Sequence, residues 1–188
     1  MARRARDRAI LNAGRALVAR GLVVGTVGNV SARDGDRLRI TPTRVAYETM
    51  RRRDLVSVGI VDGRPLGAVV PSRELPLHLA VYRARPDVSA VIHTHSVAAT
   101  AWSFLDAPLE PELEDLDYYG IGPIRTAEPA PPGSDALARN VSHALGRSNA
   151  VLLGEHGVLA VGPTVADALI AAEVVEHQAR VAWRLRER

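Results

Sequence analysis

Two histidines separated by a single residue, His93 and His95, close an apolar run at residues 88–92. Side chains alternate between the two faces of a strand, so these two imidazoles point to the same side. A third histidine, His156, lies in a second strand-like run at residues 150–157. Three neutral imidazoles with one position left open are the ligand pattern of a catalytic zinc ion. The alternative, that the histidines are ordinary surface or core residues, stays open on this spacing alone.

The chain of 188 residues contains no cysteine, and all of its 24 basic residues are arginine. The lack of thiols excludes disulfides, zinc fingers, thiol nucleophiles and iron–sulfur ligation. The lack of a lysine amine excludes Schiff-base chemistry, pyridoxal phosphate anchoring and a Walker-type phosphate loop. Any carbanion formed by this protein has to be stabilised in another way, and a bound metal ion is the obvious one.

Charge and hydropathy argue against nucleic-acid and membrane partners. The net charge is +3, but apart from a run at residues 51–53 and an N-terminal group the arginines are scattered. Aromatic residues make up 4% of the chain, too few for a base-stacking surface. No apolar stretch approaches the roughly 20 residues that span a bilayer, and the basic N-terminus lacks the pattern of a signal peptide. We expect a cytoplasmic protein, consistent with the absence of disulfides.

Hydrophobic periodicity and turn residues predict helices and strands along the chain. Helices are expected at residues 5–20, 73–83, 96–104, 134–145 and 164–186, and strands at residues 30–33, 37–41, 55–61, 88–95 and 149–161. The strand pair within 149–161 is expected to bend at His156. This order favours one α/β domain over residues 1–188, with a largely antiparallel sheet flanked by helices.

Four local details accompany these elements. The turns at residues 34–36 and 62–63 each predict a β-hairpin. Polar and apolar residues alternate at 37–41, which predicts a half-buried strand. Ser72 is expected to cap the helix that begins at Arg73. Residues 106–133, rich in Pro, Glu and Gly, are expected to be extended and partly irregular.

Several motifs together resemble the class II aldolase/adducin family. They are Gly25-Thr26-Val27-Gly28-Asn29-Val30-Ser31-Ala32-Arg33, Ile40-Thr41-Pro42-Thr43, Pro71-Ser72-Arg73-Glu74 with His78, His93-Thr94-His95, and His156-Gly157. They occur in family order and with family-like spacing from about residue 10 to residue 180. The resemblance implies a three-layer α/β/α domain, a zinc ion at the sheet edge, and a homotetramer with active sites between subunits.

The resemblance also assigns roles to individual residues. His93, His95 and His156 correspond to the zinc ligands, and Glu74 to the acid/base carboxylate. The substrate phosphate is expected at Thr26, Gly28, Asn29, Thr43 and Ser72. Physical chemistry agrees with these roles: a glycine-rich turn exposes backbone N–H groups to a phosphate, and a helix N-terminus adds oriented amides. Taken alone, the turn at residues 25–29 could equally be an ordinary hairpin turn.

Two arginines and the proton donor depart from the family pattern. Arg44 replaces a usual glycine and Arg73 replaces a usual serine; both guanidinium groups could grip the phosphate or reshape the pocket. The family's proton-donating tyrosine, which comes from a neighbouring subunit, has no clear match, and Tyr118 or Tyr119 is the nearest candidate. His78, four residues after Glu74, is either a support for the site or half of a surface pair.

The resulting hypothesis is a zinc-dependent aldolase that cleaves a short ketose 1-phosphate into dihydroxyacetone phosphate and a small aldehyde. Ligand type alone does not fix the metal, so another divalent ion remains an alternative to zinc. A metal-dependent sugar-phosphate dehydratase or decarboxylase of the same fold is the first alternative function. A non-catalytic, adducin-like interaction domain is the remote one.

Overall fold

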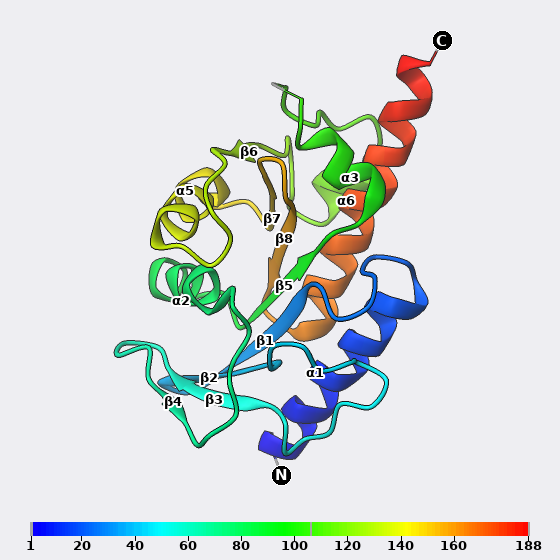
Figure 1. Ribbon diagram of the computed structural model, residues 1–188. Helices are drawn as coiled ribbons and strands as arrows, with labels where there is room; N and C mark the ends of the chain where they lie inside the picture. The colour runs from blue at the N-terminus through cyan, green and yellow to red at the C-terminus, as the bar shows by residue number, and fades with distance from the viewer. Residues whose placement is uncertain (1, 106, 188) are drawn as a thin grey trace.

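A computed structural model describes residues 2–105 and 107–187, and Figure 1 shows its arrangement around one twisted sheet. The strands are β1 Asn29–Asp34, β2 Arg37–Ile40, β3 Val56–Gly59, β4 Pro65–Leu66, β5 Ala90–Thr94, β6 Thr126–Ala127, β7 Ala150–Leu153 and β8 Gly157–Gly162. The helices are α1 Ala2–Ala19, α2 Leu75–Ala84, α3 Val97–Trp102, α4 Asp115–Tyr118, α5 Asp135–Leu145 and α6 Val165–Arg186.

The eight strands form a single sheet in the order β4-β3-β2-β1-β5-β8-β7-β6. Every neighbouring pair is antiparallel except β6 and β7, which are parallel. The two predicted hairpins are confirmed, because β1 pairs with β2 and β3 with β4 across the predicted turns. β5 lies between β1 and β8 at the centre of the sheet, where it joins the two halves of the chain.

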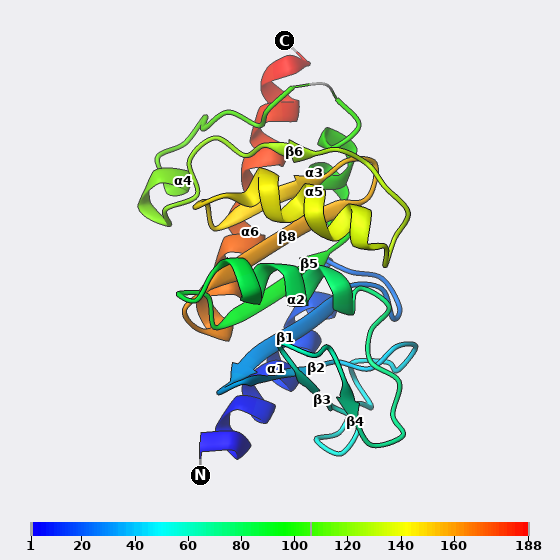
Figure 2. The same ribbon diagram turned by 90° about the vertical axis from the view of Figure 1, so that its left-hand side faces the viewer.

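Helices cover both faces of the sheet and make three layers, as expected. Helices α2 and α5 lie side by side on one face, and α1, α3 and α6 cover the other (Figures 1 and 2). Each face buries its own aliphatic cluster, one including Ile92 and Leu152 and the other including Val91 and Val151. Successive residues of β5 and β7 therefore point into opposite cores, which explains why these strands read as continuous apolar runs.

Two local predictions were wrong. β2 is not half-buried, since Arg39 is only 6% exposed and its Nε donates to the buried Asp7 carboxylate at 3.0 Å. Helix α2 begins at Leu75 instead of Arg73, with Glu74 at the N-cap position. Ser72 does not cap the helix; its Oγ accepts the backbone N–H of Glu74 at 3.2 Å in the preceding turn.

The remaining segments agree broadly with the predictions. Residues 106–133 include the short helix α4 and the two-residue strand β6 within an otherwise irregular course, residue 106 itself lying outside the described residues. Among the helices that the structure describes, none combines the length and apolar character needed to cross a bilayer.

Candidate metal centre and substrate pocket

The pairing of β5 with β8 brings three histidines together. His93 lies on β5, His95 follows the end of that strand, and His156 immediately precedes β8. The antiparallel register places Thr94 opposite Val158, so the end of β5 meets the start of β8. One ligand atom from each imidazole lies within 4.8 Å of the others, and His93 Nε2 is 2.9 Å from His95 Nε2. The predicted histidine triad is therefore formed within one chain.

A backbone carbonyl group orients the His93 imidazole, and a glycine makes room for the contact. The Nδ1 of His93 lies 2.9 Å from the carbonyl oxygen of Val158, which makes Nδ1 the protonated nitrogen and leaves the Nε2 lone pair free. Gly157 permits the close approach of the strands, because a Cβ there would lie 2.3 Å from the carbonyl oxygen of Thr94 and 3.3 Å from the His93 ring. A side chain at position 157 would thus push apart the strands that carry the ligands.

The three imidazoles fit a divalent cation. Burial lowers the pKa of His93 well below its usual value and that of His95 to a lesser extent. Burial, helped by the neighbouring His95, lowers the pKa of His156 to about 4. The rings are therefore neutral near pH 7, the form that binds metal. Among the described residues, the buried Nδ1 of His156 has no hydrogen-bond partner.

Glu74 is a buried carboxylate in the same pocket as the histidines. It is 7% exposed, and its Oε2 lacks a hydrogen-bond partner among the described residues. Burial raises its pKa, although the backbone N–H of Gly133 and the charge of Arg73 oppose that rise. Because the carboxylate does not cap helix α2, one oxygen remains available for proton transfer.

One pocket of about 340 Å³ collects most of the site residues predicted from the sequence. Its lining is made of the predicted residues Thr26, Gly28, Asn29, Thr43, Arg44, Ser72, Arg73, Glu74, His93, His95 and His156, together with Val27, Pro42 and Pro132. Segments far apart in the sequence meet here because Pro42 and Pro71 form an isolated antiparallel bridge beside the sheet. The backbone N–H of Thr43 donates to the carbonyl oxygen of Val70 at 3.2 Å in the same contact.

The glycine-rich turn depends on Gly28. This residue has a φ of 75°, and a Cβ there would lie 2.7 Å from the carbonyl oxygen of His93. Only glycine combines this left-handed conformation with such close packing. The turn therefore lies directly against the strand that carries His93, and it presents Asn29 at the start of β1 to the pocket.

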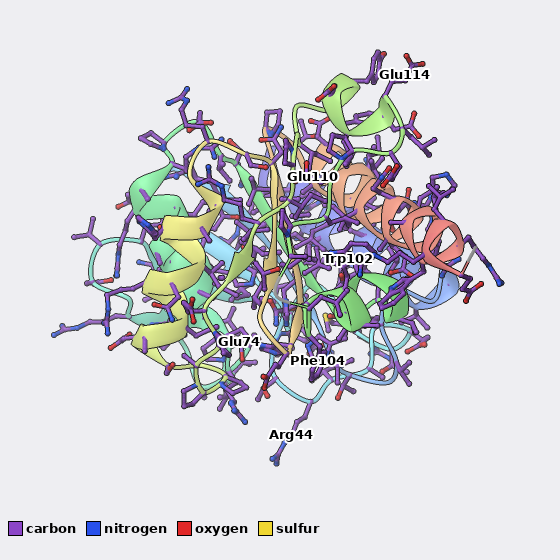
Figure 3. The ribbon with its side chains drawn as sticks, turned by 90° about the horizontal axis from the view of Figure 1, so that it is seen from above. Arg44, Glu74, Trp102, Phe104, Glu110 and Glu114 are labelled. Carbon is purple, nitrogen blue, oxygen red and sulfur yellow. The ribbon has the colours of Figure 1, made fainter. Side chains whose placement is uncertain are left out.

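The two arginines that depart from the family pattern line the rim in different ways. The Nε and Nη2 of Arg73 both donate to the carbonyl oxygen of Pro132, at 3.1 and 2.9 Å, which fixes this guanidinium against the 129–133 segment. Arg44 has a φ of 57°, a left-handed conformation. This geometry explains why a glycine suits position 44. Figure 3 shows the Arg44 side chain extending outward from the molecule, away from Glu74.

A buried chain of hydrogen bonds that sequence reasoning missed supports the pocket. Tyr82 Oη lies 2.9 Å from Ser31 Oγ, which lies 2.6 Å from His78 Nδ1, and His78 Nε2 contacts Asn29 Oδ1. His78 is fully buried, so the alternative of a surface pair with Glu74 is wrong. The spacing of His78 and Tyr82 on one face of α2, and of Asn29 and Ser31 on one face of β1, was the signal available in the sequence.

This chain of hydrogen bonds sets the orientation of the Asn29 amide. Burial lowers the pKa of His78 to about 3, so its imidazole is neutral and carries one proton. Asn29 Oδ1 can only accept, which places that proton on Nε2, and Nδ1 then accepts from Ser31. With Oδ1 held by His78, the NH₂ group of Asn29 is the part of the amide left to face the pocket.

Tyr118 and Tyr119 lie outside this pocket. They lie at the end of α4, where their side chains are 82% and 39% exposed. In Figure 3, Glu114 at the start of α4 lies at the opposite end of the molecule from Glu74 and Arg44. The structure therefore does not bring either tyrosine to the histidines of its own chain, and their assignment stays a prediction.

Known proteins are similar to this chain in sequence and in fold. Residues 8–183 match the family model described as Class II Aldolase and Adducin N-terminal domain. An L-fuculose phosphate aldolase from Methanococcus maripaludis is 34% identical over 174 residues, covering 89% of this chain and 90% of that protein. A 5-methylthioribulose-1-phosphate/5-deoxyribulose-1-phosphate aldolase from Rhodospirillum rubrum is 34% identical over 175 residues, covering 93% and 79%. The solved structure of an L-fuculose 1-phosphate aldolase has a TM-score of 0.92 and 31% identity, covering 97% and 86%.

The histidine triad predicts one divalent metal ion per chain. We expect His156→Ala to weaken zinc binding by at least about 100-fold, because losing a ligand is more severe than losing an outer partner of one. Calorimetric titration of zinc into the metal-depleted protein measures this. His143→Ala, an exposed histidine on α5, is the control and should bind zinc like the unmodified protein. Equal affinity in both variants would show that the triad is not the metal site.

Because the backbone at Arg44 is left-handed, we expect glycine to be more stabilising than alanine at this position, the reverse of the usual order in a helix. A residue with a Cβ pays about 1–2 kcal/mol in this conformation. We therefore expect Arg44→Gly to be more stable than Arg44→Ala by about 1 kcal/mol after the greater flexibility of unfolded glycine is included. Denaturant unfolding measures the difference. The same pair of substitutions at Arg139, exposed within α5, should keep the usual order with alanine more stable.

Proposed function

Because the chain belongs to the class II aldolase and adducin N-terminal domain family and is an aldehyde-lyase, we propose that it is a zinc-dependent aldolase for a short ketose 1-phosphate. The products are dihydroxyacetone phosphate and a small aldehyde. One observation carries this proposal: the free, buried carboxylate of Glu74 lies in one pocket with three neutral imidazoles and a turn suited to phosphate.

The relatives support this class of substrate. Their names include L-fuculose phosphate and 5-methylthioribulose-1-phosphate or 5-deoxyribulose-1-phosphate, which are phosphorylated ketoses with different ends. The shared part is the phosphorylated end that becomes dihydroxyacetone phosphate. In this chain Glu74 and the residues suited to phosphate match the family motifs, whereas Arg44 and Arg73 at the rim of the pocket differ from them. The phosphorylated end that these substrates share thus faces the residues that match the family motifs.

His93, His95 and His156 would hold the cation, which supplies Lewis acidity at the carbonyl oxygen of the substrate. Glu74 moves the proton. When the carbon–carbon bond breaks, the aldehyde leaves and the carbon beside the carbonyl gains a pair of electrons, to which Glu74 gives a proton. In the reverse direction Glu74 removes that proton. Burial raises the pKa of Glu74 and so brings the carboxyl group nearer to the pH at which it can both give and take a proton.

Neutral donors bind the phosphate end of the substrate. Thr26, Thr43 and Ser72 offer hydroxyl groups, Gly28 offers its backbone N–H, and the oriented amide of Asn29 offers its NH₂ group. Several neutral donors fixed in position can bind a phosphate without a lysine. Arg73, restrained by Pro132 at the rim, adds positive charge from one side. This placement leaves the interior of the pocket to the reacting carbons.

The remaining proton donor and the assembly follow the family. We propose a homotetramer in which Tyr118 or Tyr119 of one subunit approaches the pocket of a neighbour. In cleavage this tyrosine takes the proton from the hydroxyl group that becomes the aldehyde, and in the reverse direction it gives the proton back. Their exposure on α4 leaves both hydroxyl groups accessible to another subunit. A cytoplasmic location and one catalytic domain over residues 1–188 complete the proposal.

Replacing Glu74 tests the mechanism. We expect Glu74→Gln to lower kcat for cleavage by about 100- to 10,000-fold, the range for a general acid/base group, with the zinc affinity kept. Glu48→Gln, at an exposed position outside the pocket, should retain the activity of the unmodified protein. Activity is followed by the release of dihydroxyacetone phosphate from L-fuculose 1-phosphate and from 5-deoxyribulose 1-phosphate.

The same assay separates the alternatives. An aldolase gives two carbon fragments, a dehydratase gives one product and water, and a decarboxylase releases carbon dioxide. Full cleavage activity in Glu74→Gln would overturn the assigned role of Glu74. A single product, or carbon dioxide, from a panel of sugar phosphates and phosphorylated sugar acids would replace the aldolase assignment.

The Asn29 amide provides a second test, directed at phosphate binding. Asn29→Asp keeps an acceptor for His78 but turns a carboxylate oxygen toward the phosphate. Loss of a hydrogen bond to a charged group is worth about 1.5–3 kcal/mol, so KM should rise by roughly 10- to 100-fold while kcat changes far less. His78→Gln, which can still donate to Asn29, should keep a lower KM than His78→Leu. An unchanged KM in Asn29→Asp would place the phosphate elsewhere.

A further inference from the structure

A second pocket, of about 680 Å³, is lined almost entirely by arginine. Its lining consists of Arg3, Arg4, Asp7, Arg39, Arg52, Arg53 and Leu55. Its lining residues come from the first turns of α1, from β2 and from the segment that connects β2 to β3. Figure 1 shows these elements in the half of the molecule that contains the N-terminus. It shares no lining residue with the histidine pocket, so the proposed aldolase chemistry does not use it.

Buried charges form the floor of this arginine pocket. Asp7 is 2% exposed and Arg39 is 6% exposed. Arg39 Nε donates to Asp7 Oδ1 at 3.0 Å, and its Nη2 donates to the carbonyl oxygen of Arg52 at 3.2 Å. Arg52 Nε reaches the other oxygen of the same carboxylate at 3.5 Å. Asp7 and Arg39 therefore form a fixed floor, and the exposed Arg52 joins it from the edge.

The arginines exceed the acidic groups that could neutralise them. Asp7 is the single carboxylate in the lining, and it already serves both Arg39 and Arg52. Asp54 stands 3.9 Å from Arg53, an exposed pair of little strength. Within the part of the chain that the structure describes, Arg3 and Arg4 have no ion-pair partner. Several guanidinium groups thus crowd one concavity and repel each other unless an anion lies between them.

We propose that this arginine pocket binds a chain of phosphate groups, with triphosphate as the minimal ligand. Guanidinium groups match phosphate oxygens in pairs through parallel N–H bonds, and several of them can share one ligand with several phosphates. The lining contains no aromatic ring to stack on a base, and Leu55 is its one apolar side chain. The phosphate chain itself is therefore the recognised group, and a nucleoside adds little to it.

A triple variant at the rim tests this proposal. Arg3→Gln, Arg4→Gln and Arg53→Gln together remove three rim charges and leave Arg52 and the floor of Asp7 and Arg39 unchanged. The control triple carries Arg64→Gln, Arg139→Gln and Arg147→Gln, all exposed and outside the pocket, and so has the same net charge. Binding of sodium triphosphate and of ATP without magnesium is measured by calorimetry and thermal shift.

We expect saturable triphosphate binding to the unmodified protein and to the control triple, at least tenfold weaker binding to the rim triple, and weaker binding to all three at high salt. ATP should bind within threefold of triphosphate. Equal triphosphate binding to the two triple variants would overturn the proposal. Binding of triphosphate to the histidine pocket would give this equal binding. Triphosphate can also chelate the metal ion and remove it from the protein. This effect would be equal in both triple variants, so it can be distinguished from binding to the arginine pocket.

Two further outcomes contradict the proposal. If no binding is detected at triphosphate concentrations up to roughly 1 mM, the affinity is too weak for a specific site. The arginines would then be only a solvated surface. ATP binding more than tenfold tighter than triphosphate would show that the nucleoside is recognised and that the ligand class is wrong.

Discussion

The close antiparallel contact between the end of β5 and the start of β8 is the constraint on which the site depends. Gly157 allows it, because any side chain there would meet the carbonyl oxygen of Thr94. The same contact brings the carbonyl of Val158 to the Nδ1 of His93 and so directs the other ring nitrogen toward its neighbours. The meeting of the three imidazoles and the tautomer of His93 thus follow from one piece of strand pairing, and burial keeps the rings neutral.

The start of α2 connects this strand pairing to proton transfer. Pro76 has no backbone N–H, and that of Leu77 donates to the carbonyl oxygen of Glu74 at 3.0 Å, so the Glu74 carboxylate is not needed as a cap. Further along α2, His78 and Tyr82 bury their polar atoms against Ser31 and Asn29 of β1. The start of this helix therefore places a carboxylate beside the histidines, and its next turns fix an amide on the side of the pocket proposed for the phosphate. Displacement of α2 would disturb both functions together.

The sequence was most informative where strand alternation and glycine requirements decide the geometry. His93 and His95 had to share a face, and His156 lay at the bend of the next strand pair, so the triad could be predicted. The start of α2 could not, because the position of Ser72 before the helix depends on the contact of the 70–72 segment with residues 41–43. The burial of Arg39 was missed since its partner, Asp7, lies 32 positions away on α1. The residues near Arg39 in the sequence do not indicate its ion pair with Asp7.

The distribution of charge explains how a chain without lysine could bind the phosphorylated substrate proposed for it. Arg73 is tied to Pro132 at the rim, where its charge still lowers the pKa of Glu74 and of His156, and Arg44 extends outward. The interior of the pocket instead holds neutral imidazoles, hydroxyl groups and an amide, with Glu74 as its one acidic group. A cation held by the imidazoles would then be the main positive charge beside the substrate carbonyl. Its effect on the reacting carbons would be strong because the imidazoles, hydroxyl groups and amide around it carry no net charge.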